Sequence, residues 1–467
     1  MRKDMPYKLY DIIPSQQTMY FLLKYSIHKQ VVQIPLCVTV RENLDIDILK
    51  KAFVEEIKRN DALRIRFVKA DKQIKQYFLP EYVPEDIPVM HFGSTVLRDE
   101  YFQKDAQKPV KLFKSVPYRF VIFTLPDGST GMYMNVSHLV TDAIGGALFF
   151  SDLLGVYKAL KNGTDMPEPL ASYEEYIQTE FSYLANEKKH GRDRDWYIHY
   201  WKDNGRLFYA GIHGHDLLDK ARKKDPDITV PAAYDPIHDK ADVIKKEVSK
   251  ELTEKIYAYC REHMVPPEVM FLYGERAHAS KVNYRAPDIL NMLMCSRRAT
   301  LTSKRVGGCL AQPLQLRTSH EETETFAQAV DKLSACRNNL VRHMNFPYLE
   351  ARGLQQEIQH LSAMQGPSCL MFSWLPVTYA AKESGIDFDF TAYCMGRYVM
   401  PLYVFAVPNP KDGGTDFYYM RRSNFIKTEH IDLLHKNMIS ALEKGIANPD
   451  MTVGQLLDEL EDFPWQI

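Results

Sequence analysis

The most constraining feature of this sequence is an apolar strand that runs through a short polar turn directly into an apolar helix. Residues 132–136 read as a buried strand, and residues 143–157 read as a buried helix. Gly145 and Gly146 stand at the start of that helix, where they permit close backbone packing. A polar residue at a strand end, just before a helix, is a common place for active-site chemistry, and His138 occupies that place.

The same alternation of strands and helices recurs along the chain, which predicts the mixed α/β (α+β) class. With 467 residues, 45% of them apolar, the chain exceeds one simple core and suits two lobes of roughly 200 residues, each a mixed sheet packed with helices. Charge clusters and prolines gather between the lobes. We therefore expect an N-terminal lobe at 1–185, a crossover with exposed loops at 186–250 and a C-terminal lobe at 251–467.

Composition excludes several classes of protein. The 59 Lys and Arg residues almost cancel the 60 Asp and Glu residues, which argues against a nucleic-acid binder. No run of 18 apolar residues exists, so we expect no transmembrane segment, and the charged N-terminus predicts no signal peptide. The seven dispersed cysteines suit free thiols in the cytosol. His213-Gly214-His215 lacks a third spaced ligand, so no metal site is expected.

The spacing His-x-x-x-Asp is not specific by itself, because it occurs three times: His138/Asp142, His199/Asp203 and His215/Asp219. Context separates the first pair, which alone follows a buried strand and precedes a glycine pair. Two interpretations of this pair remain open on the local sequence. His138 is either a catalytic base or a hydrogen-bonded core histidine, with Asp142 as a helix N-cap.

Further elements on both sides of His138 follow one another in a recognisable order. They are Pro14-Ser15-Gln16-Gln17, residues 59–67, Ser137 to Gly146, Tyr200-Trp201-Lys202, Ser296-Arg297, Val306 to Arg317, Thr325-Phe326 and residues 343–347. In content, order and spacing the chain resembles the condensation-domain branch of the chloramphenicol acetyltransferase-like superfamily, over nearly all its length. Ser137 to Gly146 occupies the place of the motif His-His-x-x-x-Asp-Gly.

The resemblance implies two chloramphenicol acetyltransferase-like lobes with an active-site tunnel between them, and His138 as the general base. It implies that Asp142 orders the turn through an ion pair with an arginine, for which Arg297 matches better than its neighbour Arg298. Oxyanion or motif contacts would come from Ser137, Gly145, Gly146 and Ser373. The acyl donor would be a pantetheine thioester, either acyl-CoA or a phosphopantetheinyl carrier protein, with no permanently bound cofactor.

Two positions depart from the motif: Ser137 replaces its first histidine, and Ala143 replaces the glycine after the aspartate. Three functions therefore stay open. The first is acyl transfer to a small hydroxyl or amine acceptor by a stand-alone, monomeric enzyme. The second is peptide-type condensation between carrier-bound substrates supplied in trans, since the chain has no adenylation or carrier motif. The third is a degenerate, non-catalytic binding domain.

Overall fold

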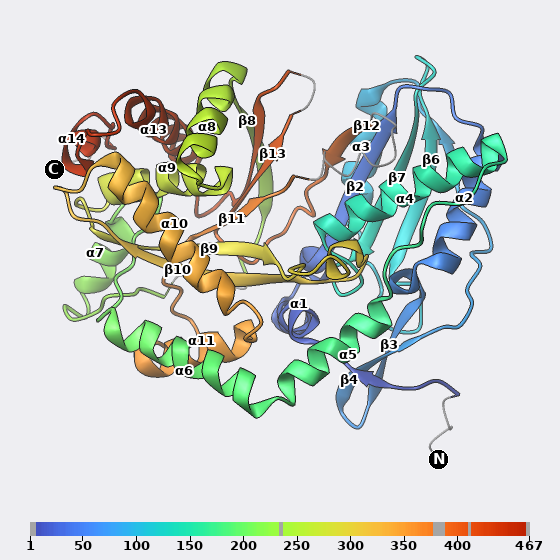
Figure 1. The fold of residues 1–467 in the computed structure, drawn as a ribbon, viewed down its shortest axis with the longest axis horizontal. Coiled ribbons are helices and arrows are strands. Elements are labelled where there is room, and N and C mark those ends of the chain that lie inside the picture. Colours follow the sequence, from blue (N-terminus) through green and yellow to red (C-terminus); the bar gives the residue numbers. More distant parts are fainter. Residues whose placement is uncertain (1–5, 233–236, 377–387, 410–411, 464–467) are drawn as a thin grey trace. The chain divides into compact units, whose positions relative to one another are not determined.

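The computed structural model describes residues 6–232, 237–376, 388–409 and 412–463, and the chain divides into two compact units (Figure 1). The first unit comprises Met1–Glu187, Ser296–Gln312 and Pro376–Arg397. The second comprises Lys188–Cys295, Pro313–Leu375 and Tyr398–Ile467.

This division differs from the expected one in two respects. Residues 188–250 are not a separate crossover but part of the second unit, and two segments of the C-terminal half belong to the first unit. The region expected to be loops contains α6 (Glu187–Asp203), α7 (Asp216–Arg222) and β8 (Ala241–Val248). β8 lies at the edge of its sheet and is half exposed, so its many charged residues gave it the composition of a loop.

The first unit is built on a five-stranded sheet with β7 at its centre. In sheet order the strands are β12 (Phe388–Ala392), β2 (Gln33–Val40), β7 (Thr130–Ser137), β6 (Tyr118–Thr124) and β5 (Val89–His91). β7 is antiparallel to both β2 and β6, β12 is antiparallel to β2, and β5 is parallel to β6. Every residue of β2 and β7 is buried, as expected for strands covered on both faces.

Helices cover both faces of this sheet: α2 (Ile46–Arg59), α4 (Ala143–Asn162) and α3 (Thr95–Ala106). α2 and α4 pack side by side (Figure 1), and Phe120 of β6 stacks on Phe149 of α4 at 5.2 Å. On the other face, Phe102 of α3 stacks on Tyr133 of β7 at 4.1 Å. Alternate residues of each strand therefore serve the two layers.

The first unit also contains further helices and a small sheet. They are α1 (Pro14–Tyr25), α5 (Tyr173–Leu184), the short helices η1 (Lys29–Val32), η2 (Asp61–Arg64) and η3 (Ser303–Arg305), and a three-stranded sheet of β1 (Tyr10–Asp11), β4 (Gln73–Phe78) and β3 (Ile65–Ala70). Asp61 caps α5 by accepting from the amides of Tyr173 and Glu174 at 2.8 and 3.0 Å.

The second unit contains a mixed six-stranded sheet. In order its strands are β10 (Ala311–Ser319), β9 (Asp288–Ser296), β11 (Leu370–Trp374), β13 (Leu402–Pro408), β14 (Thr415–Arg422) and β8. β9, β11 and β13 run parallel, and β14 and β8 complete an antiparallel edge. Its other helices are α8 (Lys250–His263), α9 (Pro267–Val282), α10 (Phe326–Arg342), α11 (Tyr348–Ile358), α13 (Thr428–Ala447) and α14 (Val453–Asp458).

Among the described helices, α4 alone is long and apolar enough to cross a membrane, with a mean hydropathy of 1.3. Sixty-one per cent of that stretch is buried within the protein. Phe149, Phe150, Leu153 and Leu154 are all buried in the core of the first unit. The apolar character of α4 is therefore explained by its packing in this core.

Candidate active site

His138 comes directly after the last residue of the central strand β7. Ser137 still pairs with Gln33 of β2, and the His138 amide donates to the Val32 carbonyl at 3.1 Å. The Val140 amide then donates to the Ser137 carbonyl at 2.9 Å, which turns the chain toward α4. Strand pairing thus fixes the backbone of His138, while the residue as a whole stays partly exposed.

Asp142 is the N-cap of α4. Its Oδ1 accepts from the Gly145 amide at 2.8 Å, and its carbonyl accepts from the Gly146 amide at 2.8 Å. The first bond satisfies a donor that the helix start leaves without a partner, and the second is the first backbone bond of the helix. Because both glycine amides are used inside the helix, they cannot serve as oxyanion donors, contrary to expectation.

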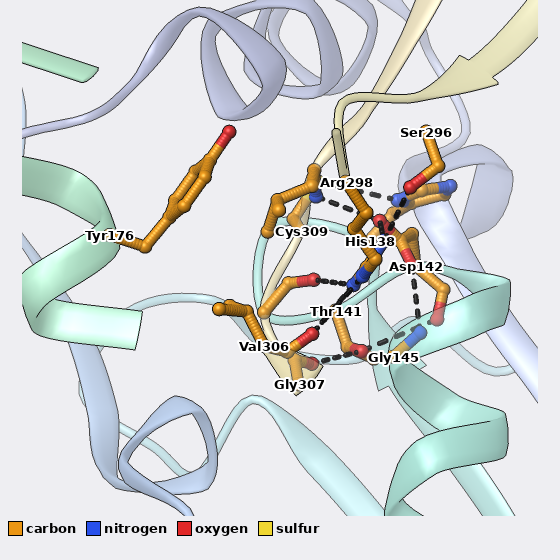
Figure 2. A network of polar contacts seen from close by, with 12 residues as sticks. His138, Thr141, Asp142, Gly145, Tyr176, Ser296, Arg298, Val306, Gly307 and Cys309 are labelled. Atoms are coloured by element: carbon orange, nitrogen blue, oxygen red, sulfur yellow. Dashed lines mark hydrogen bonds and ion pairs between the residues drawn. The ribbon is translucent and has the colours of Figure 1, made fainter. Parts of the chain in front are cut away.

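Arg298, not Arg297, forms the ion pair with Asp142 (Figure 2). Nη1 of Arg298 lies 2.7 Å from Oδ2 of Asp142, and both side chains are buried. Arg297 instead places its Nη1 2.7 Å from Oε2 of Glu180 in α5. The Arg297 amide bonds the Leu310 carbonyl, and the Ala299 amide bonds the Arg297 carbonyl, so the chain makes a tight turn at Arg298 just after β9 and the two side chains reach different partners. The assignment to Arg297 was wrong by one residue.

Arg298 also closes the loop between β9 and β10. Its Nη2 donates to the carbonyls of Val306 and Gly308 at 2.9 and 2.8 Å, and the Leu310 amide donates to Oδ2 of Asp142 at 2.7 Å. Figure 2 shows these groups gathered around the carboxylate and the guanidinium. Burial alone would raise the pKa of Asp142, but the charge of Arg298 and the hydrogen bonds outweigh it and lower the pKa. Asp142 is therefore ionised and fully engaged.

A second buried ion pair anchors α5 to the same loop. Glu180 receives Arg297 on one oxygen, and the Tyr176 hydroxyl donates to its Oε1 at 2.6 Å. The Tyr173 hydroxyl donates to the Cys309 carbonyl at 3.2 Å. The two arginines therefore hold one loop between the turn after β7 and α5.

The imidazole of His138 is set up to be neutral at pH 7. Burial of the ring lowers its pKa, and the charge of Asp142 and hydrogen bonding to the backbone of His138 and Thr141 offset this only in part. Nδ1 lies 3.8 Å from Sγ of the buried Cys309. Because Nδ1 faces the interior, Nε2 is the nitrogen available to accept a proton.

Gly145 has no room for a side chain. A Cβ there would overlap the Thr141 hydroxyl and the Gly307 carbonyl. Thr141 Oγ1 donates to that same carbonyl at 2.6 Å. Ala143, in contrast, is the first residue of α4, a conformation that any L-residue adopts without strain. The replacement of the motif glycine by Ala143 therefore leaves the backbone of the turn intact.

A family model described as the condensation domain matches residues 7–363. The chain belongs to the condensation-domain family. It is 21% identical over 451 residues to a plipastatin synthase protein of Bacillus subtilis (strain 168), covering 96% of this chain and 17% of that protein. It is 20% identical over 459 residues to surfactin synthase subunit 1 of the same strain, covering 96% and 12%. The chain thus spans about a sixth or less of the length of these curated relatives.

Solved condensation domains share the fold. The first condensation domain of the calcium-dependent antibiotic synthetase, in complex with a substrate analogue, matches with a TM-score of 0.78 at 17% identity, covering 96% of this chain and 99% of that one. The starter condensation domain of rhizomide synthetase, in complex with C8-CoA, matches with a TM-score of 0.78 at 13% identity, covering 96% and 97%. The predicted α/β class with two chloramphenicol acetyltransferase-like lobes is confirmed.

The two serines named from the sequence have different positions in this condensation domain. Ser137 is buried at the end of β7, and its Oγ accepts weakly from the Leu139 amide at 3.4 Å. It shapes the turn. Ser373 belongs to β11 of the second unit, where its hydroxyl bonds the Tyr403 hydroxyl at 2.9 Å. A role for Ser373 at the site, like the tunnel between the lobes, stays a prediction.

The other two His-x-x-x-Asp pairs lie on helices of the condensation domain. His199 and Asp203 both belong to α6, and Nδ1 of His199 bonds the Asp195 carbonyl at 2.7 Å. His215 is the residue just before α7, and its Nδ1 lies 2.6 Å from Oδ2 of Asp219 in that helix. Neither histidine follows a strand, as their sequence context predicted.

Three side chains that stabilise the turn of the condensation domain were not expected from the sequence to do so. Gln16 donates from Nε2 to the Leu139 carbonyl at 2.9 Å, so the Pro-Ser-Gln-Gln element supports the residue after His138. Thr141 bonds Gly307, and Cys309 contacts His138. Gln16 lies in the Pro-Ser-Gln-Gln element, and this position could have indicated its role. The contacts of Thr141 and Cys309 join segments 166 and 171 positions apart, and no local pattern reports them.

Proposed function

We propose that this condensation domain transfers an acyl group from a pantetheine thioester to a hydroxyl or amine acceptor, with His138 as the general base. One observation carries the proposal. His138, a partly exposed residue whose lowered pKa keeps its ring neutral, stands at the end of the central strand, four residues before an ionised aspartate that is engaged by Arg298. A core histidine would need neither exposure nor so elaborate a support.

The reaction follows from that arrangement. The acceptor hydroxyl or amine attacks the thioester carbonyl as Nε2 of His138 takes its proton. The tetrahedral intermediate collapses, the carbon–sulfur bond breaks, and the imidazolium returns the proton to the leaving thiolate. Products are the ester or amide and a free thiol, and no covalent acyl-enzyme forms. Asp142 does not accept the proton in this scheme, because Arg298 and two amides already engage it.

The start of α4 offers donors for the developing oxyanion. Among the described residues, no backbone hydrogen bond uses the amides of Ala143 and Ile144, whereas those of Gly145 and Gly146 are occupied. Amides at a helix N-terminus stabilise negative charge. We assign the oxyanion to the first two residues of α4 in place of the glycines.

Two thioester donors are compatible with this proposal. A solved starter condensation domain of the same fold is described in complex with C8-CoA, which supports acyl-CoA as donor. The curated relatives are synthase proteins several times longer than this chain, which supports a carrier-bound donor. Thiol release from medium-chain acyl-CoA and from acyl-loaded carrier protein, each with a panel of hydroxyl and amine acceptors, distinguishes them.

The decisive comparison uses His138→Ala. We expect acceptor-dependent thiol release to fall by about 10²–10⁴-fold, the usual contribution of a general base. The matched control is His199→Ala, which removes a histidine with the same spacing to an aspartate from a helix surface and should leave the rate unchanged. Since the pKa of His138 is lowered, the wild-type rate should hold at pH 6.5 and decline only at lower pH. Equal rates in wild type and His138→Ala with every donor would refute the proposal and favour a binding domain.

A second candidate is amide formation between two carrier-bound substrates. The names of the curated relatives favour it, because plipastatin and surfactin synthase proteins match along 96% of the chain. Intact-mass analysis of two loaded carrier proteins mixed with the domain tests it directly. Transfer of the acyl mass from one carrier to the other supports condensation. Transfer to a free small acceptor supports the first candidate.

A further inference from the structure

The thiol of Cys309 lies beside the imidazole that we propose as the base. Sγ is 3.8 Å from Nδ1 of His138, and the cysteine is fully buried. A sulfur at this distance from a ring nitrogen can form a weak hydrogen bond as donor or acceptor. The loop that brings Arg298 to Asp142 therefore also brings a specific side chain to the buried nitrogen of His138.

The position of Cys309 is fixed from several sides. Its carbonyl accepts from the Tyr173 hydroxyl at 3.2 Å, and the next amide, Leu310, donates to Asp142 at 2.7 Å. A Cβ on Gly308 would overlap the Tyr173 ring, so the loop lies flat against α5. The backbone of Cys309 cannot move away from His138 without breaking contacts that also hold Asp142.

The thiol is poorly suited to be a nucleophile. Burial raises the pKa of Cys309 well above its usual value, and the charge of Asp142 raises it further. The thiolate is the nucleophilic form of cysteine, so a thiol kept protonated beside His138 is inert. What it can still do is constrain the ring through Nδ1.

We propose that Cys309 is a positioning residue that holds His138 in the tautomer with its proton on Nδ1. The backbone of His138 and Thr141 also favours a proton on the ring, and a histidine reaches its own backbone through Nδ1. The Nδ1–H group then points at carbonyl oxygen and at the Cys309 sulfur. Nε2 keeps its lone pair toward the exposed side. The catalytic consequence rests on the proposed function, but the tautomer does not.

Nitrogen NMR of protein labelled with isotope in its histidine rings tests the tautomer directly. His138→Ala identifies the His138 signals by their loss. We expect wild type to carry the proton on Nδ1, Cys309→Ala to shift toward the other tautomer, and Cys309→Ser to restore the first, because a hydroxyl oxygen accepts well. Cys37→Ala removes an equally buried thiol from the same unit and should leave the His138 signals unchanged. A proton on Nε2 in wild type, or no change in Cys309→Ala, overturns the proposal.

Thiol-release kinetics add the catalytic readout. Cys309→Ala should lower kcat several-fold with little change in KM, and Cys309→Ser should recover most of the rate. An equal loss in both variants would indicate a packing role alone and contradict the proposal. If wild type releases no thiol from any donor, the proposed function fails, while the NMR result still decides the role of Cys309.

Discussion

At the scale of single residues, the site depends on which of two adjacent arginines faces Asp142. Arg298 satisfies one carboxylate oxygen and two loop carbonyls, whereas Arg297 serves Glu180. Both pairs are buried, and removing one partner of a buried pair typically costs about 3–5 kcal/mol. Loss of stability alone therefore cannot tell the two arginines apart.

A double-mutant cycle does tell them apart. We expect Asp142→Asn and Arg298→Ala to be strongly coupled, with an interaction energy of about 1–3 kcal/mol in urea unfolding, because each removes the same ion pair. Asp142→Asn and Arg297→Ala should be coupled more weakly, because the Arg297 side chain pairs with Glu180 and not with Asp142. Equal coupling in the two cycles would show that the aspartate has no preferred arginine.

At the scale of elements, the site forms where the start of α4 packs against the loop between β9 and β10. Gly145 is the point of closest approach, since a side chain would meet both Thr141 and Gly307 there. The hydrogen bonds of Thr141 and Asp142 across this contact require the short distance. Helix start and loop are therefore one packed unit.

Gly145→Ala should destabilise the protein by about 1–3 kcal/mol, the usual cost of adding a methyl group to a filled core. It should also reduce thiol release, because the turn carrying His138 must shift. Gly191→Ala is the matched control: it lies inside α6 with no atom near its Cβ position. Since alanine favours helix, this control should be neutral or more stable by up to about 1 kcal/mol. A stable, active Gly145→Ala would contradict the packing argument. Thermal melts and the kinetic assay measure both effects.

Elements with long, regular hydrophobic periodicity were predictable from the sequence. Residues 45–57 and 428–446 carry apolar residues at helical spacing and form α2 (Ile46–Arg59) and α13 (Thr428–Ala447). Residues 118–125 and 131–136 are apolar segments on either side of the Pro126-Asp127-Gly128 turn and form β6 and β7. β8 was missed because an exposed edge strand carries the charges of a loop.

The residues of the candidate site also differ in whether the sequence could predict them. His138 and Asp142 were predictable because strand, turn and glycines are neighbours in sequence. The choice of Arg298 over Arg297 was not, because it depends on a tight turn at Arg298 that is set by backbone bonds of Arg297 with Leu310 and Ala299. Cys309 was not predictable either, since a thiol acquires its role here only through contact with a ring that is distant in the sequence.

At the scale of the whole molecule, acid should destabilise the protein through buried histidines of the second unit. Burial lowers the pKa of His213 to about 3 and the pKa values of His278 and His435 to about 4. In the unfolded chain a histidine has a pKa of about 6.5. Below pH 6.5 these histidines therefore bind protons in the unfolded chain but stay neutral in the folded unit. The free energy of unfolding should fall from pH 6.5 to about 4, by up to about 1.4 kcal/mol per pH unit for each histidine.

The hydrogen bonds of His278 explain why its ring stays neutral in the folded unit. Nε2 lies 2.8 Å from the Ile212 carbonyl and donates to it, and Nδ1 accepts from the side-chain amide of Asn437 at 3.1 Å. Protonating Nδ1 would set two donors against each other in the core. We expect His278→Gln to lower stability at pH 7 but to flatten the loss between pH 6.5 and 4 by up to one histidine's share. His91→Gln, at an exposed site of the first unit, should leave the slope unchanged. Urea unfolding at several pH values measures the slope, and the same slope in His278→Gln as in wild type would show that this buried ring does not drive the acid sensitivity.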